Sequence, residues 1–238
     1  MSPLWPETRR LFVGPERLSL DAPDGPGVAL DLHGGWEAAF AAMPALPRRT
    51  RLQLQVADRH VRYVHLAWPA GLRRTEREAF AGQRFAAVFG PGPWAVQIDR
   101  EALCLPSLGA ALPAGLQGAI KAFARERGMK VTGLAPAFAA AFNALRPRLA
   151  GDGALARLEA GRVTLGLWRA GQWCAVRSLP VAQADTAAAV AGLLPLLAAR
   201  PAGETWVQPV LHLTGGAAGP AGLALPEGWR LQHLEDAA

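Results

Sequence analysis

The chain of 238 residues is 51% hydrophobic and 18% charged, which supplies enough apolar side chains for a large core and excludes general disorder. Its formal net charge is +6, because 25 Lys and Arg stand against 19 Asp and Glu. The basic residues are nearly all arginine and are scattered in pairs along the chain, a pattern that favours solvated arginines over a nucleic-acid-binding surface.

The first part of the chain alternates short strand patterns with short helices. Residues 51–57 alternate cleanly, with Leu52, Leu54 and Val56 on one side and polar residues on the other, as in a half-buried strand. Pro15–Glu16 separates two short apolar segments and predicts a strand, a turn and a second strand. The strands expected in this part cover residues 10–14, 17–20, 28–32, 51–57, 60–68, 94–99 and 131–134.

Helices are expected between these strands. Thr75 and Glu78 have the spacing of a capping box. The helix behind them carries an apolar stripe made of Ala81, Phe85, Val88 and Phe89. Pro113 opens another helix, which ends before Gly128 and has a core stripe made of Leu116, Ile120 and Phe123. Two shorter helices cover residues 36–43 and 138–145.

A glycine-rich hinge is expected at residues 149–153, and three strands follow it in quick succession. Their tight links contain Gly161 and Gly171, which suits hairpins. Asp185 then begins a helix to about Arg200, with a kink expected at Pro195. The strands expected in this part cover residues 154–159, 163–169, 173–179, 206–213 and 229–234.

No apolar run reaches the roughly 18–20 residues that a membrane-spanning helix needs. The first ten residues lack a basic flank followed by an apolar stretch, so we expect no secretory signal and a cytoplasmic protein. Cys104 and Cys174 are too far apart for a disulfide framework, and the five histidines form no pair with metal-ligand spacing. The sequence therefore predicts no metal site.

Two short motifs are candidates for ligand binding. Glu159 precedes the turn glycine Gly161, and a carboxylate beside such a turn can hold Mg²⁺ through water, although an exposed hairpin glutamate has the same pattern. Gly215 and Gly216 follow a buried strand, where the missing Cβ atoms let another group approach the backbone. A tight turn packed against its own chain fits this second motif equally well.

The sequence contains none of the common catalytic motifs. The glycine-rich loops of nucleotide-binding enzymes are absent, and so is the G-x-S-x-G nucleophile turn. The few serines have no neighbouring base in sequence. We therefore expect no catalytic residues and a protein that is not an enzyme.

The order of the elements resembles the actin-like fold, in which two related lobes flank a nucleotide cleft. Two stretches resemble the PilM family and the related cytoplasmic domain of GspL, the assembly-platform proteins of type IV pili and type II secretion. One stretch runs from Leu158 to Leu165, followed by Gly171-Gln172-Trp173 and Arg177, and stands where that family has its second-lobe phosphate hairpin. The other, His212-Leu213-Thr214-Gly215-Gly216, is similar to the adenosine-side Gly-Gly loop.

This resemblance implies an α/β chain with a two-lobed, degenerate actin-like (ribonuclease H-like) fold, in which helices flank mixed sheets. The first lobe is expected at residues 1–150 and the second at 151–238. The family's first-lobe phosphate turn contains an aspartate, whereas the turn here is Val13-Gly14-Pro15-Glu16, and Glu159 replaces the second-lobe aspartate. Turnover of ATP needs a carboxylate that organises Mg²⁺ and a positioned water. The resemblance thus implies a vestigial nucleotide site made of Glu159, Gly161, Gly215 and Gly216, without a cofactor.

By resemblance, the protein is expected to be a non-catalytic cytoplasmic scaffold at the inner membrane. It would bind the cytoplasmic tail of a PilN-like inner-membrane protein and contact an assembly ATPase, with peripheral membrane association favoured by its basic surface. The alternative is a nucleotide-binding actin-like protein with weak ATPase activity that uses ATP and magnesium. A third hypothesis, an arginine-rich module that binds nucleic acid, is disfavoured by the scattered arginines, and no nucleic-acid partner is expected.

Overall fold

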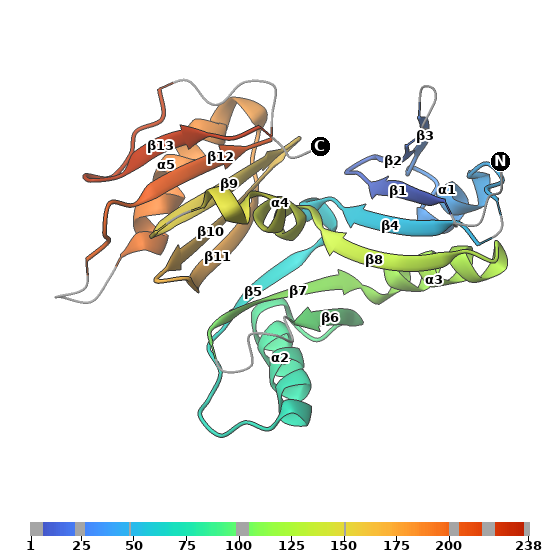
Figure 1. Cartoon of the computed structure of the whole chain (residues 1–238), viewed down its shortest axis with the longest axis horizontal. Coiled ribbons are helices and arrows are strands. Elements are labelled where there is room, and N and C mark those ends of the chain that lie inside the picture. Colours follow the sequence, from blue (N-terminus) through green and yellow to red (C-terminus); the bar gives the residue numbers. More distant parts are fainter. Residues whose placement is uncertain are drawn as a thin grey trace. The chain divides into compact units, whose positions relative to one another are not determined.

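The computed structural model describes residues 7–21, 27–47, 49–98, 105–149, 151–199, 205–215 and 222–235. The chain divides into two compact units and passes between them several times (Figure 1). The first unit comprises Met1–Val61, Pro93–Ala95 and Leu112–Ala137. The second comprises Arg62–Gly92, Val96–Ala111 and Phe138–Ala238. The expected lobe boundary at residue 150 stays a prediction.

The first unit contains a five-stranded mixed sheet in the order β3-β2-β1-β4-β8. β1, β2 and β3 are antiparallel neighbours, whereas β4 and β8 run parallel to β1. Leu52, Leu54 and Val56 are buried as the alternation predicts, because successive side chains of a strand point to opposite faces. The strands span Thr8–Val13 (β1), Arg17–Leu20 (β2), Val28–Asp31 (β3), Arg51–Val56 (β4) and Lys130–Pro136 (β8).

Two helices of the first unit, α1 (Trp36–Ala42) and α3 (Ala114–Glu126), pack against each other. Their contact includes the rings of Phe40 and Phe123, whose centroids lie 5.1 Å apart. α3 begins directly after Pro113 and buries Leu116, Ile120 and Phe123, which confirms the predicted helix and its core stripe.

The second unit contains a five-stranded sheet with the same plan, in the order β11-β10-β9-β12-β13. β9, β10 and β11 are antiparallel neighbours, and β12 and β13 run parallel to β9. The two sheets therefore share one topology, a three-stranded antiparallel array followed by two strands parallel to its first strand. The strands span Gly153–Glu159 (β9), Arg162–Arg169 (β10), Gln172–Pro180 (β11), Val210–Thr214 (β12) and Arg230–His233 (β13).

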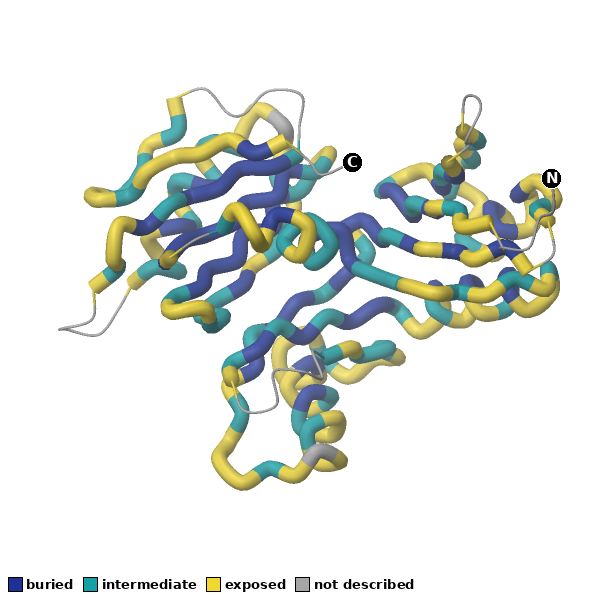
Figure 2. Tube along the Cα trace, viewed as in Figure 1, coloured by how far each residue is buried: buried dark blue, intermediate teal, exposed yellow. Residues whose placement is uncertain are grey.

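Helices cover both faces of this second sheet. α5 (Thr186–Ala198) lies on one face and buries Val190 and Leu194 against apolar side chains of β9, β10 and β12. Figure 2 shows these central strands as the most continuously buried part of the unit. α4 (Ala137–Leu145) brings aromatic rings to the other face, where Phe142 lies 4.4 Å from Trp173 between ring centroids. The core of the unit is therefore the sheet with its two helical layers.

A smaller sheet in the order β5-β7-β6, in which β5 and β7 are antiparallel, carries helix α2 (Arg74–Phe89). Ala81 and Phe85 of the predicted stripe are buried, whereas Val88 and Phe89 are 49% and 36% exposed. The stripe is therefore confirmed only in its first half, although the guanidinium of Arg62 in β5 lies 6.0 Å from the ring centre of Phe89. The strands span Arg62–Leu66 (β5), Trp94–Ile98 (β6) and Ser107–Pro113 (β7).

Three local predictions differ from the structure. The capping box at Thr75 is wrong, because the backbone N–H of Arg73 donates to Glu76 at 2.7 Å and the helix begins two residues earlier. β7 was not predicted, since its small residues and glycine show no alternation. β12 begins at Val210 and not at residue 206, because Pro209 has no N–H to contribute to a ladder.

Asp152, in the expected hinge, is a buried anchor between segments of the second unit. Its carboxylate accepts the backbone N–H of Ala170 at 2.9 Å and that of Val207 at 3.1 Å. Asp152 thereby joins the β10–β11 turn to the segment that leads into β12. Hinge motion at residues 149–153 stays a prediction.

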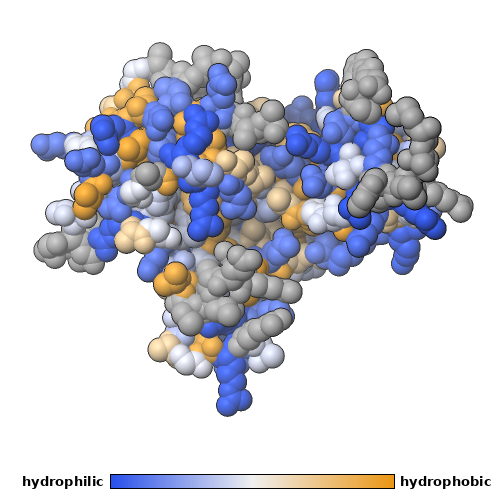
Figure 3. Space-filling view, viewed as in Figure 1, coloured by the Kyte–Doolittle hydropathy of each residue, from blue (hydrophilic) through white to orange (hydrophobic). Residues whose placement is uncertain are grey.

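Hydrophilic side chains are spread over the visible face of the molecule, with small hydrophobic patches between them (Figure 3). No helix in the described ranges combines the length and the apolar character that crossing a bilayer requires.

Candidate functional site

Three of the four predicted site residues lie at one edge of the second sheet. Glu159 ends β9, Gly161 lies in the turn to β10, and Gly215 directly follows β12. β9 and β12 are parallel and pair in register from Gly153–Val210 to Arg157–Thr214, so their carboxyl ends meet at the same edge. The structure thus brings these motifs together, while Gly216 lies outside the described residues.

Glu159 is held in a buried ion pair. Its Oε1 accepts a hydrogen bond from Nη1 of Arg157 at 2.6 Å, and only 10% of the Arg157 side chain and 7% of the Glu159 side chain are exposed. The two residues are two positions apart on one strand, so both side chains point to the same face of the sheet. The positive charge of Arg157 neutralises the carboxylate of Glu159. A metal-binding role would need that carboxylate to be available.

Gly161 has the geometry of a turn residue. Its φ of 73° lies in the left-handed region that favours glycine, and a Cβ there would meet no atom within 4 Å. Its carbonyl accepts the backbone N–H of Val181 at 3.0 Å. The conformation of the hairpin therefore explains this glycine, and the space beside it is open.

Gly215 is explained by close packing within its own chain. Its φ is 78°, and a Cβ at this position would lie only 2.2 Å from the carbonyl oxygen of Leu158 in β9. No side chain fits between the end of β12 and the end of β9. Of the two explanations that the sequence left open for this motif, the geometry at Gly215 matches the tight turn packed against its own chain.

Polar side chains that the sequence analysis did not single out line the same face of the sheet. Thr164 Oγ1 and Ser178 Oγ lie 2.9 Å apart, and Arg162 Nη1 donates to Ser178 Oγ at 3.1 Å. Thr214 is buried beside Arg157 in the ladder. The signal in the sequence was the spacing of two for polar residues, at Arg157 and Glu159 in β9 and at Arg162 and Thr164 in β10. Arg162, Thr164 and Ser178 interact with one another through hydrogen bonds. This arrangement is typical of a structural network.

His212 is the most unusual residue of this face. It is 2% exposed, and neither of its ring nitrogens has a hydrogen-bond partner in the part of the chain that the structure describes. Its ring stacks on Trp168 with an interplanar angle of 17°. Burial, with a smaller contribution from the positive charge of Arg148, lowers the pKa of His212 from 6.5 to about 4. The imidazole is therefore neutral at physiological pH.

The lowered pKa of His212 makes stability depend on pH. The unfolded chain binds this proton below a pKa of 6.5 and the folded chain only near 4, so stability falls as the pH drops through this window. We expect a loss of roughly 3 kcal/mol in the free energy of unfolding between neutral pH and about pH 4 from this group. Urea denaturation across this range should show the loss diminished in His212→Phe and unchanged in a variant of the exposed His33, His33→Gln. An equal loss of stability with falling pH in all three proteins would contradict the assignment of this loss to His212.

The corresponding turn of the first unit, between β1 and β2, is closed by its own hydrogen bonds. The backbone N–H of Gly14 donates to the carbonyl of Arg17 at 2.8 Å, and Nε2 of His60 donates to the carbonyl of Gly14 at 2.8 Å. Glu16 lies 3.9 Å from Arg59 at the surface. Within the described residues, no group of three or more His, Cys, Asp and Glu side chains is placed to hold a metal ion.

Comparison with known proteins places this architecture in a structural class. No protein-family model matches the chain, and no curated protein matches it in sequence. Solved structures, however, match over most of its length, and they share the actin-like ATPase fold. The chain has this fold, which confirms the predicted fold class.

Two of the similar structures belong to a type II secretion system and to a type IV pilus biogenesis complex. The cytoplasmic domain of EpsL, an inner-membrane component of the type II secretion system of Vibrio cholerae, matches with a TM-score of 0.58 and 11% identity over 97% of this chain and 90% of its own. The PilM–PilN type IV pilus biogenesis complex matches with a TM-score of 0.56 and 15% identity over 92% and 84%. An actin-like ATPase-fold protein of unknown function from Bacteroides thetaiotaomicron matches with a TM-score of 0.57 and 11% identity over 89% and 83%. The predicted resemblance to PilM and the GspL cytoplasmic domain is confirmed at the level of fold.

Proposed function

We propose that this protein is a non-catalytic scaffold of a type IV pilus-like or type II secretion-like assembly platform. The observation that carries the proposal is the buried pair of Arg157 and Glu159. It occupies the hairpin edge where the actin-like resemblance places a phosphate-binding loop, and it neutralises the carboxylate there. A second support is the fold shared with EpsL and PilM, which belong to such platforms.

The proposed partner is the cytoplasmic tail of a PilN-like inner-membrane protein, with an assembly ATPase as a second contact. The solved PilM structure is itself a complex with PilN. A net charge of +6 favours the anionic cytoplasmic face of the inner membrane, so we place the protein on that face as a peripheral component. Affinity capture with the full chain as bait should recover a single-span inner-membrane protein, and recovery of none would contradict the platform.

The alternative, a nucleotide-binding protein with weak ATPase activity, makes the opposite prediction for ATP and Mg²⁺. We expect calorimetric titration to show no binding at micromolar concentrations, because Glu159 is paired with Arg157 and the corresponding first-unit turn has Glu16 and no aspartate. Binding in that range that is lost in Gly161→Val would establish the alternative. Gly171→Val is the matched control, since Gly171 has the same kind of hairpin turn with a φ of 76° and open space beside it.

A further inference from the structure

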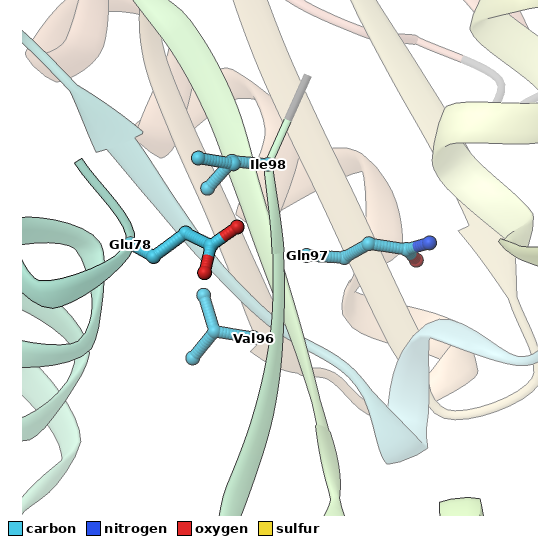
Figure 4. Close-up of a pocket in the computed structure, with 4 residues that line it drawn as sticks. All are labelled: Glu78, Val96, Gln97 and Ile98. Atoms are coloured by element: carbon cyan, nitrogen blue, oxygen red, sulfur yellow. The ribbon is translucent and has the colours of Figure 1, made fainter. Parts of the chain in front are cut away.

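An open hollow lies between helix α2 and the part of the edge strand β6 that belongs to the second unit. Its volume is about 590 Å³, and it is lined by Glu78 of α2 and by Val96, Gln97 and Ile98 of β6. Figure 4 shows Val96 and Ile98 extending from β6 toward α2, with the carboxylate of Glu78 between them and Gln97 pointing to the other side. Among the described residues, the hollow therefore has an aliphatic floor and one acid, Glu78, in its wall.

The hollow exists because α2 packs over the other two strands of the small sheet, β5 and β7. Its buried residue Phe85 lies over β5 and β7, where a Cβ on Gly109 would come within 3.1 Å of Phe85 and 2.8 Å of Leu66. The glycine lets the helix approach these two strands closely. The described residues do not cover β6 in the same way, and Val96 and Ile98 are half-buried.

β6 is also an edge strand. The sheet order is β5-β7-β6, so β7 is its only sheet partner in the described residues. An edge strand presents backbone N–H and C=O groups to which an extended peptide can add as a further strand. In that arrangement alternate side chains of the peptide would enter the hollow, because strand side chains repeat every second residue.

The charge of the hollow selects the kind of peptide. Glu78 is exposed and makes no ion pair that the structure records among the described residues, whereas its neighbour Arg77 lies over the ring of Trp68 at 5.6 Å. A carboxylate beside two aliphatic side chains fits a lysine or arginine whose methylene stem packs on the floor. Cytoplasmic segments next to a membrane span are rich in these residues.

We propose that the hollow between α2 and β6 binds an extended, cationic segment of the partner's cytoplasmic tail, which adds to β6 as a strand and places a lysine or arginine against Glu78. That this segment belongs to an inner-membrane protein rests on the proposed function. The hollow itself requires only a peptide with alternating aliphatic and basic side chains.

A synthetic ten-residue peptide that alternates valine and lysine is the probe. Fluorescence anisotropy with the full chain should show saturable binding with a dissociation constant below about 1 mM. Hydrogen exchange should slow at the amides of β6 when the peptide is present. The same peptide with N-methylated alternate amides should not bind, because it lacks the donors that strand addition needs, and a peptide with glutamate in place of lysine should not bind either.

Glu78→Lys should weaken binding of the probe about tenfold, since it replaces an attraction by a repulsion at one exposed site. Glu227→Lys makes the same change of net charge at another exposed position of the second unit and should leave binding within about twofold. Circular dichroism should show that both variants are folded. No saturable binding, or an equal loss in both variants, would overturn the proposal.

The outcomes separate this inference from the proposed function. If the full chain captures a single-span membrane protein and Glu78→Lys captures it equally well, the hollow is not the docking site while the platform stands. If the probe binds at the hollow but no membrane protein is captured, the docking site stands and the platform is wrong.

Discussion

Replacing Gly215 by alanine is expected to lower the free energy of unfolding by about 3 kcal/mol, because two unfavourable effects combine at this position. The residue has a φ of 78°, which an alanine adopts only with strain. The new Cβ would also lie 2.2 Å from the carbonyl oxygen of Leu158, a backbone atom that cannot rotate away. The ends of β12 and β9 would have to separate.

Gly161→Ala is the matched control for this experiment. Gly161 also has a left-handed conformation, with a φ of 73°, but nothing lies within 4 Å of a Cβ there. Gly161→Ala should lower the free energy of unfolding by only about 1 kcal/mol, because the conformational strain is its only cost. Urea denaturation followed by tryptophan fluorescence would measure both variants. Equal stabilities for the two variants would show that Gly215 does not pack against β9. The missing Cβ would then be explained by the approach of a ligand to the backbone.

Removing Arg157 is expected to destabilise the fold strongly. Arg157→Leu leaves the buried carboxylate of Glu159 without this cation, and breaking one side of a buried pair typically costs about 3–5 kcal/mol. Replacing both residues by leucine should recover much of the loss, because it removes the buried charge together with its partner. Arg59→Leu, which disrupts the exposed pair with Glu16, should cost less than about 1 kcal/mol.

The double substitution also bears on function. If Glu159 serves the structure, the doubly substituted protein should still capture the membrane-protein partner, and added Mg²⁺ should not raise the stability of the unaltered protein. A rise in its thermal midpoint with Mg²⁺ that disappears on Glu159→Gln would instead identify Glu159 as a metal-binding carboxylate. The stability of the variants and the effect of Mg²⁺ on stability can both be measured on the same samples with the same denaturation assay.

The local elements of this protein were predictable because their signals are local. The alternation in residues 51–57 and the glycine turns at Gly161 and Gly171 predicted β4 and the hairpins of β9, β10 and β11, which the structure confirms. β7 was missed because alanine, glycine and leucine carry no alternating pattern. Its identity as a strand comes from pairing with β5 along its length.

The candidate site was predicted as a set of residues but not as an arrangement. The sequence indicated that Glu159 and Gly161 belong to a turn and that Gly215 ends a strand. It held no signal that Arg157 would neutralise Glu159, since an arginine two positions away is also compatible with an exposed strand. It held none for the hollow at Glu78 either, because that hollow depends on how α2 packs over β5 and β7 beside β6.

The sequence by itself determined the alternating strands, the glycine turns, the apolar helix stripes and, through its resemblance, the actin-like class of the chain. The tertiary structure decided which strands are neighbours, why Gly215 must be a glycine, and where polar groups are paired or left facing solvent. The reason is physical. Hairpins join residues that are close along the chain, whereas β9 meets β12 across more than fifty residues, and the contacts at their ends arise only when the whole sheet has formed.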